Sequence, residues 1–215
     1  MLVDLYLKGK NVVVFGGGNE AELKVTKVLD DHAKVTVVSK EFTSLLWRLG
    51  DEGKIRIIEY DLENGYDSLK GKIEKPHVAF LATDSADLNR KGTDFAKSLG
   101  AMVCVVDTPA LCDFAMPAIA KVGEVRIGIS TGGRSPIVAK MLRQRIESML
   151  TKEDLLQMEL QEYAKKKIRP KIGKFDSRKK FLWKIVGNDK IQSLLKENKV
   201  EQAKSIVDEM IEQVV

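Results

Sequence analysis

A glycine-rich turn near the start of the chain constrains its fold more than any other feature. The apolar run Asn11–Phe15 leads into Gly16-Gly17-Gly18-Asn19-Glu20-Ala21, and apolar residues then recur at helical spacing. The turn fits the pattern G-x-G-x-x-A, in which glycines allow a tight turn and a close pyrophosphate, and alanine allows helix–strand contact. We therefore expect a strand, a turn and a helix that bind a dinucleotide. The alternative is a turn of the same shape in another kind of α/β protein.

Short apolar runs and helical patterns alternate through the first half of the chain. Further strands are expected at Val35–Val38, Ile55–Ile58, Val78–Ala82 and Met102–Val106, with helices at Phe42–Leu49 and Asp84–Leu99. Alternation of this kind is typical of a parallel, doubly wound sheet. The expected fold class is therefore α/β, with a Rossmann-type sheet followed by a helical C-terminal region.

The pattern changes after Asp107. A loop containing proline is expected from Thr108 to Pro117, then one strand at Val125–Ile129 and a long helix from Pro136 to about Leu150. Only helical patterns follow, at Lys152–Lys167, Ser177–Val186, Asp189–Glu197 and Val200–Val214, and Thr151 with Asp154 suits a capping box. The expected organisation is a sheet domain over residues 1–112, a segment over 113–150 and a helical domain over 151–215.

Polar residues follow the second and fourth expected strands, at the edge where open α/β sheets bind ligands. Ser39 and Lys40 stand where a ribose-binding acid would end the second strand. An acid there disfavours a 2′-phosphate and a lysine tolerates one, so NAD and NADP both stay open. Thr83 and Asp84 follow the fourth strand and either contact the cofactor or cap the next helix.

Two further polar groups follow apolar runs in the centre of the chain, and both are expected at strand ends of the sheet. Asp107 either caps a turn with Thr108 and Pro109 or acts as a general base or substrate anchor. The loop Ser130–Ser135 offers hydroxyls, backbone N–H groups and the Arg134 guanidinium to a carboxylate or phosphate. Lys140 and Arg143 follow on one helical face, for which a solvated basic helix is the alternative.

Composition points to a soluble protein without targeting signals. No apolar run approaches the roughly 18 residues that a membrane helix needs, and the first residues lack a secretory cleavage site. We therefore expect a cytoplasmic protein with no membrane partner. Cys104 in a strand and Cys112 in a loop have no histidine or third cysteine nearby, so free thiols are expected. No metal site is expected.

Positive charge is concentrated in the C-terminal region. The chain carries a net charge of +5, and Lys165–Lys184 contains ten basic residues and one acid, Asp176. Such a field attracts polyanions, either nucleic acid or a polycarboxylate. Phe175, Phe181 and Trp183 recur at helical spacing, so we expect them in a core rather than on a nucleic-acid surface. No nucleic-acid partner is expected.

Several motifs together resemble the precorrin-2 dehydrogenase/sirohydrochlorin ferrochelatase family over roughly residues 5–150. The glycine turn is one of them, and the family's A-T-D/N-D-x-x-x-N element appears as Ala82-Thr83-Asp84-Ser85-Ala86-Asp87-Leu88-Asn89. The most specific are Val105-Val106-Asp107-x-Pro109-x-Leu111-Cys112-Asp113-Phe114-x-x-Pro117-Ala118 and Ile129-Ser130-Thr131-Gly132-Gly133-x-Ser135-Pro136.

The resemblance implies an NAD-dependent dehydrogenase that converts precorrin-2 to sirohydrochlorin on the route to siroheme. The acid that matches Asp107 is the family's essential catalytic residue. The cofactor contacts predicted in this way are Gly16, Gly18, Asn19, Glu20, Ala21, Ser39, Lys40, Thr83 and Asp84, and the substrate contacts are Ser130, Thr131, Gly132, Gly133, Arg134, Ser135 and Lys140. A homodimer is also implied, with residues 113–150 serving dimerisation and tetrapyrrole binding.

Two questions stay open at this point. Some members of the family also insert Fe²⁺ into sirohydrochlorin, and nothing in this sequence decides that activity. The rival to an enzyme is a regulatory module that senses nucleotides without catalysis. Such a module accounts for the glycine turn but gives no reason for the pairing of Asp107 with the Ser130–Ser135 loop.

Overall fold

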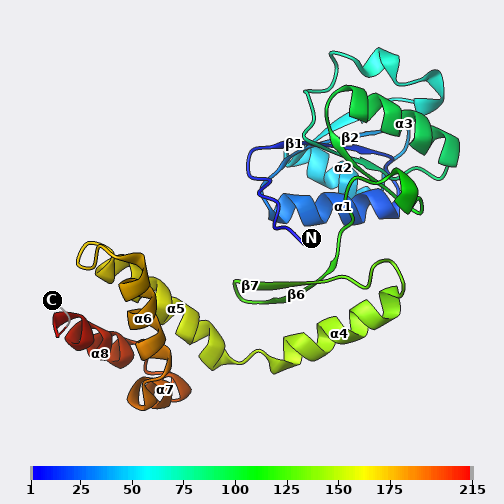
Figure 1. Cartoon of the computed structure of the whole chain (residues 1–215). Helices are drawn as coiled ribbons and strands as arrows, with labels where there is room; N and C mark the ends of the chain where they lie inside the picture. Colours follow the sequence, from blue (N-terminus) through cyan, green and yellow to red (C-terminus); the bar gives the residue numbers. More distant parts are fainter. Residues whose placement is uncertain (1, 214–215) are drawn as a thin grey trace. The chain divides into compact units, whose positions relative to one another are not determined.

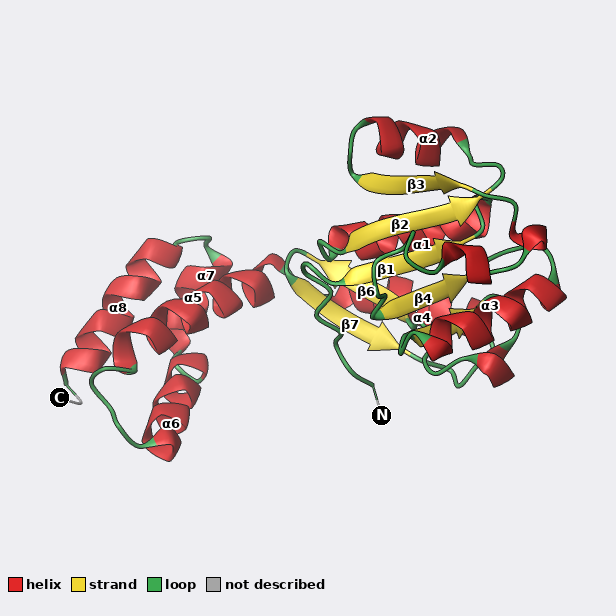
Figure 2. Ribbon diagram, turned by 90° about the horizontal axis from the view of Figure 1, so that it is seen from above, coloured by secondary structure: helices red, strands yellow, loops and turns green. Residues whose placement is uncertain are grey.

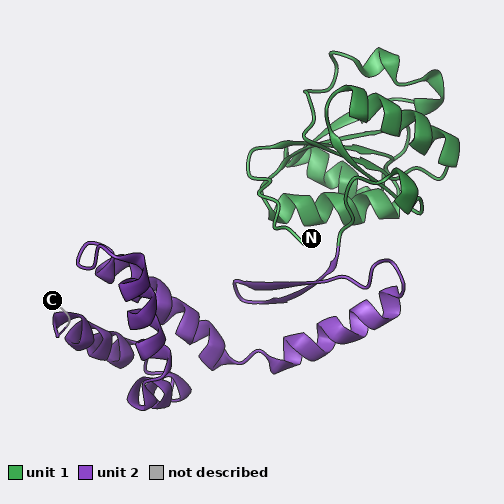
Figure 3. Ribbon diagram, viewed as in Figure 1, with its two compact units in different colours: residues 1–116 green, residues 117–215 purple. Residues whose placement is uncertain are grey.

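The computed structural model of the chain describes residues 2–213. The chain forms two compact units, which meet in sequence between Met116 and Pro117 (Figure 3). Unit 1 precedes this junction and unit 2 follows it. In the described residues no helix is long and apolar enough to cross a membrane.

Unit 1 is built on a parallel five-stranded sheet in the order β3-β2-β1-β4-β5 (Figures 1 and 2). The strands are β1 (Asn11–Phe15), β2 (Lys34–Ser39), β3 (Ile55–Glu59), β4 (Val78–Leu81) and β5 (Met102–Val105). The helices are α1 (Asn19–Asp30), α2 (Ser44–Asp51) and α3 (Ala86–Ser98). The short 3₁₀ turns are η1 (Leu62–Asn64), η2 (Asp67–Leu69) and η3 (Pro109–Leu111). The predicted doubly wound α/β sheet is confirmed, and the strand order reverses direction between β1 and β4.

Helices cover the sheet on both faces, as the continuous apolar strands require. Val12 and Val14 of β1 pack with α1 and α2, whereas Val13 and Phe15 pack with α3 and the 3₁₀ turns. Figure 1 shows α1 and α3 on opposite faces of the sheet. Phe15 of β1 pairs with Val38 of β2 and Leu81 of β4, so the carboxyl ends of the three central strands lie at one edge.

Unit 2 begins with an antiparallel hairpin, of which the sequence pattern predicts the second strand but not the first. Its strands are β6 (Ala118–Val122) and β7 (Val125–Ile129), joined by a two-residue turn in which Gly123 has a φ of 56°. The expected loop up to Pro117 is followed by β6, which was not predicted because its run is short and interrupted by Lys121. The prediction that the Ser130 loop follows a strand of the parallel sheet is wrong, because β7 pairs only with β6.

The rest of unit 2 is helical. The helices are α4 (Pro136–Met149), α5 (Lys152–Ile168), α6 (Phe175–Val186), α7 (Asp189–Lys196) and α8 (Val200–Glu212). Helices α5 to α8 share a core of their own, which includes Leu160, Ile185 and Val207. The predicted capping box of Thr151 and Asp154 is confirmed. The end predicted for the last helix, Val214, lies outside the described residues.

The aromatic residues of α6 divide between two faces of the helix. Phe181 is buried together with Ile185, which confirms its predicted place in a core. Phe175 and Trp183 are 70% and 66% exposed, so the prediction that they are core residues is wrong. Trp183 lies on the side of the helix opposite Phe181 and Ile185, which occupy the side packed on α5. Phe175 is the first residue of the helix.

Candidate active site at the sheet edge

The glycine turn leaves open backbone at the start of α1. A Cβ on Gly16, whose φ is 113°, would collide with the carbonyl of Ala82, and one on Gly17 would collide with the carbonyl of Glu41. A Cβ on Gly18 would meet nothing within 4 Å, and within the described residues no side chain caps the helix there. The first N–H groups of a helix need partners and favour anions. These residues therefore fit a pyrophosphate.

The first turn of α1 carries two acids, and each has a partner beside the turn. Glu20 forms an ion pair with Lys24 at 3.4 Å, and Lys24 is mostly covered. Glu22 accepts a hydrogen bond of 2.5 Å from the hydroxyl of Thr43, which itself caps α2. Both carboxylates thus have cationic or hydroxyl partners beside the turn, which limits their repulsion of a bound phosphate.

Ser39 and Lys40 lie where β2 ends, next to the glycine turn. The Ser39 Cβ lies 3.0 Å from the place where a Cβ on Gly17 would stand. The Ser39 carbonyl accepts from the Tyr60 N–H at 2.8 Å, which fixes the backbone there. Lys40 is exposed. The structure therefore brings Ser39 to the turn, as a ribose contact requires.

Hydrogen bonds between the Asn89 side chain and Thr83, here called the Asn89 ring, hold the turn after β4. The buried Asn89 of α3 accepts from the Thr83 N–H at 3.1 Å and from its hydroxyl at 2.8 Å, and donates to the Thr83 carbonyl at 3.0 Å. The cap of α3 is Ser85, which accepts from the Leu88 N–H, so of the two alternatives for Thr83 and Asp84 the helix cap is wrong, and the cofactor contact stays a prediction. Asn89 is a positioning residue that sequence reasoning left out of the site, although its place in the motif marked it.

Asp107 stands at the same edge, two residues beyond β5. The Val106 N–H donates to the carbonyl of Leu81 at 2.9 Å, which joins the end of β5 to the end of β4 beside Thr83. Asp107 has a φ of 58° and is exposed. Within residues 2–213 its carboxylate makes no hydrogen bond or ion pair, so it does not cap the turn with Thr108. Its carboxylate is therefore exposed and has no partner among the described residues.

The two cysteines flank this acid and are both free thiols. Cys104 lies in β5 and Cys112 in the loop after η3, as predicted. Burial, followed by the neighbouring Cys112, raises the pKa of the Cys104 thiol to about 11, so it stays protonated at neutral pH. In the described part of the chain no three His, Cys, Asp or Glu side chains gather as metal ligands.

The Ser130–Ser135 loop in unit 2 is ordered by its own hydroxyls. The Thr131 hydroxyl donates to the Ser135 carbonyl at 3.2 Å and accepts from the Ser135 N–H at 3.3 Å. Ser135 then caps α4 by accepting from the Val138 N–H. Gly132 and Gly133 have φ values of 62° and 77°, which other residues rarely adopt. Arg134 and Lys140 are exposed, so both are accessible to an anion.

Comparison with known proteins assigns the chain to a family. Residues 3–118 match a family described as putative NAD(P)-binding, and residues 123–149 match the central part of sirohaem biosynthesis proteins. A precorrin-2 dehydrogenase of Methanosarcina barkeri is 34% identical over 188 residues, which cover 87% of this chain and 83% of that protein. The chain belongs to the precorrin-2 dehydrogenase family.

This precorrin-2 dehydrogenase family member is also similar to a solved structure and to part of a longer protein. The solved structure of SirC, a precorrin-2 dehydrogenase, superimposes with a TM-score of 0.75, covering 97% of this chain and 99% of that one. At 19% identity this likeness shows a shared fold. A siroheme synthase of Actinobacillus pleuropneumoniae is 28% identical over 202 residues. The chain spans 40% of the length of that siroheme synthase.

Proposed function

We propose that the protein oxidises precorrin-2 to sirohydrochlorin, with NAD as hydride acceptor, as a step of siroheme biosynthesis. One observation carries the proposal: the unpaired carboxylate of Asp107 stands at the strand edge that also holds the glycine turn, in a member of the precorrin-2 dehydrogenase family. Open α/β sheets bind ligands where the strand order reverses, and here β1 and β4 flank that point. A regulatory module gives no reason for an unpaired acid there.

The proposed chemistry divides between cofactor and protein. Oxidation of a partly reduced macrocycle removes a hydride and a proton, and the nicotinamide supplies the hydride acceptor when bound. The N–H groups at Gly18 and Asn19 would hold the pyrophosphate, and Ser39 the ribose. Asp107 would accept the proton or orient the ring nitrogens, since a carboxylate within reach of the proton acts as a general base.

The substrate carries eight carboxylates, and the protein offers cations and N–H groups to meet them. In our proposal the loop Ser130–Ser135, together with Lys140, binds these carboxylates through hydroxyls, exposed backbone and the Arg134 guanidinium. The positive φ values of Gly132 and Gly133 support this, because they expose backbone N–H groups without a Cβ in the way. The basic stretch Lys165–Lys184 adds a field that attracts the same polyanion.

The finer parts of the proposal concern assembly and coenzyme. We expect a cytoplasmic homodimer in which residues 113–150 take part in dimerisation, with a cofactor-binding domain before them and a helical domain after them. NAD is the proposed coenzyme, although the exposed Lys40 beside Ser39 would accept the 2′-phosphate of NADP. Fe²⁺ insertion, as a second activity, would use the nitrogens of the macrocycle as ligands, with Asp107 receiving their protons.

The test is turnover by the purified protein. Precorrin-2 is supplied with NAD⁺ or NADP⁺ side by side, and NADH formation and the absorption spectrum of sirohydrochlorin are followed. We expect equal amounts of NADH and sirohydrochlorin, with NAD⁺ the better substrate. Fe²⁺ is then added, and a faster appearance of siroheme than in a protein-free control would establish iron insertion. Tight NAD⁺ binding without turnover would favour the regulatory module instead.

A further inference from the structure

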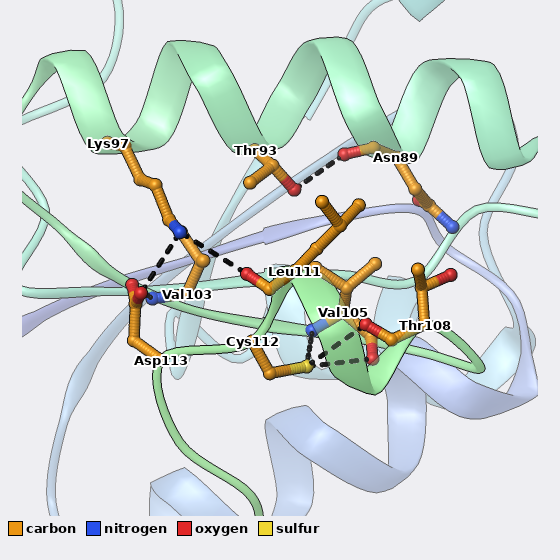
Figure 4. Close-up of polar contacts among 9 residues, drawn as sticks. All are labelled: Asn89, Thr93, Lys97, Val103, Val105, Thr108, Leu111, Cys112 and Asp113. Carbon is orange, nitrogen blue, oxygen red and sulfur yellow. Dashed lines mark hydrogen bonds and ion pairs between the residues drawn. The ribbon is translucent and has the colours of Figure 1, made fainter.

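Residues that follow Asp107 in the sequence form hydrogen bonds to the outer edge of β5, the strand that leads to Asp107. β5 is the last strand of the sheet, so its outward N–H and C=O groups need partners other than a strand. The Val103 N–H donates to the Asp113 carboxylate at 2.9 Å, and the Asp113 N–H donates back to the Val103 carbonyl at 2.9 Å (Figure 4). The chain thus folds back on its own strand edge.

Cys112 completes this edge and also reaches across the Asp107 turn. Its Sγ accepts from the Val105 N–H at 3.1 Å and lies 3.4 Å from the Val105 carbonyl and 3.6 Å from the Thr108 carbonyl. The thiol has one proton, so it donates to one of these carbonyls at a time. The sulfur therefore ties the residue two places before Asp107 to the residue directly after it.

A lysine of α3 anchors the same segment to the helical layer. The Lys97 ammonium forms an ion pair with Asp113 at 3.0 Å and donates to the Leu111 carbonyl at 3.3 Å. The hydrogen bond from the Val103 N–H, with help from Lys97, holds the pKa of the Asp113 carboxyl below its ordinary value. Asp113 is therefore charged at neutral pH, and Figure 4 shows its link to Lys97.

Asp107 needs such support because its backbone is left-handed. A φ of 58° is unfavourable for a residue with a side chain and persists where the surroundings fix it. We propose that Cys112 and Asp113 are positioning residues that hold the Asp107 turn, and with it the carboxylate, in the geometry for proton transfer. The inference rests on the proposed dehydrogenase function. Neither residue touches the substrate in this account.

The first test compares cysteine variants in the NADH assay. Cys112→Ala should lower kcat about tenfold with both KM values changed less than about twofold, since misplacing a catalytic group slows chemistry more than binding. Cys112→Ser retains a donor and acceptor and should restore part of the loss. Met102→Ala is the control, because Met102 is an exposed residue of the same strand, and kcat should stay within about twofold.

The second test asks whether the loss passes through Asp107. In an Asp107→Asn background, Cys112→Ala should lower the residual rate hardly at all, because the two changes remove the same catalytic contribution. A residue needed only for folding would lower the rate by the same factor in both backgrounds. Asp113→Asn and Lys97→Met alter exposed side chains and serve as a second pair should Cys112→Ala fold poorly.

Amide hydrogen exchange tests the same contact without any turnover. The Val103 and Val105 N–H groups should exchange slowly in the wild type, and Cys112→Ala should speed exchange at Val105 while Met102→Ala does not. Equal kcat for Cys112→Ala and Met102→Ala, a loss confined to KM, or multiplicative losses with Asp107→Asn would overturn the inference. If the wild type lacks turnover but shows this exchange pattern, the proposed function fails while the contact stands.

Discussion

Two turns leave the same edge of the sheet in unit 1, and they are stabilised in different ways. The turn after β1 adopts its unusual backbone with glycine, since Gly16 has a φ of 113° and no Cβ to collide with Ala82. The turn after β5 adopts a φ of 58° with an aspartate, and side chains of Cys112, Asp113 and Lys97 support it.

The difference follows from the role that we propose for each turn. A turn that binds a phosphate through backbone N–H groups needs room and no side chain, which glycine provides. A turn that presents a carboxylate must keep its side chain, so its strain is compensated by neighbouring groups. The backbone conformation of the turn after β5 does not itself require an aspartate. The side chains that support this turn therefore indicate that the carboxylate of Asp107 is needed for another reason.

The largest expected effect comes from filling the glycine turn. Gly16→Ala should destabilise the protein by more than about 2 kcal/mol, because it adds left-handed strain and a collision with the Ala82 carbonyl. Chemical denaturation measures this loss. Gly18→Ala is the control: a Cβ there meets open space, so stability should hold within about 0.5 kcal/mol while NAD affinity falls about tenfold. Equal stability of both variants would contradict the account.

The next effect concerns the hydrogen bonds between Asn89 and Thr83 in the turn after β4, the strand that lies between β1 and β5. Asn89→Ala removes three hydrogen bonds to Thr83 and leaves its backbone groups without those partners, which should cost about 1–3 kcal/mol in unfolding free energy. The exposed Arg90 offers a control, since Arg90→Ala should leave stability within about 0.5 kcal/mol. Thermal unfolding compares the two, and a larger loss for Arg90→Ala would exclude a structural role for the Asn89 ring.

A smaller effect should appear in coenzyme choice. Lys40→Ala removes the exposed cation beside Ser39 and should lower kcat/KM for NADP⁺ about fivefold, with little change for NAD⁺, because only NADP⁺ carries a 2′-phosphate. Steady-state rates with each coenzyme measure it. Lys34→Ala, at the opposite end of β2, is the control. Equal losses with both coenzymes would remove Lys40 from the ribose site.

The smallest expected effect is a pH dependence of stability that comes from Asp113, which supports the Asp107 turn. The Asp113 carboxyl has a lowered pKa in the folded protein, so its contribution to stability is present above the unfolded value, about 3.9, and is lost as pH falls through the folded value. Asp113→Asn should therefore lower the Tm by about 1–3 °C at neutral pH. The difference from wild type should shrink below about pH 4. A difference that grows in acid would contradict this assignment.

Local patterns predicted most of unit 1 and less of unit 2. The glycine turn and the five strands follow from apolar runs and turn residues, and β1 begins and ends where predicted. β6 escaped prediction because its pairing with β7, rather than its own composition, makes it a strand. The exposure of Phe175 and Trp183 depends on which side of α6 meets α5, and periodicity alone does not choose that side.

The same limit applies to the site. Gly16, Ser39, Thr83 and Asp107 were placed from strand ends, and the sheet brings those strand ends to one edge. Asn89 and Cys112 stand in the motifs quoted above, but their contacts, like those of Lys97, form only in the folded chain, so the sequence did not reveal their supporting role. The roles of the predicted contacts stay predictions until ligands are bound.

The role of Asp107 is the central claim, and single-turnover oxidation tests it most directly. Wild type and Asp107→Asn are mixed with saturating NAD⁺ and precorrin-2, after equal NAD⁺ affinity and equal Tm have been established for both. We predict that NADH forms at least about a hundredfold more slowly in Asp107→Asn, since a general base contributes a factor of this order. NADH formation at the wild-type rate by Asp107→Asn would contradict the account.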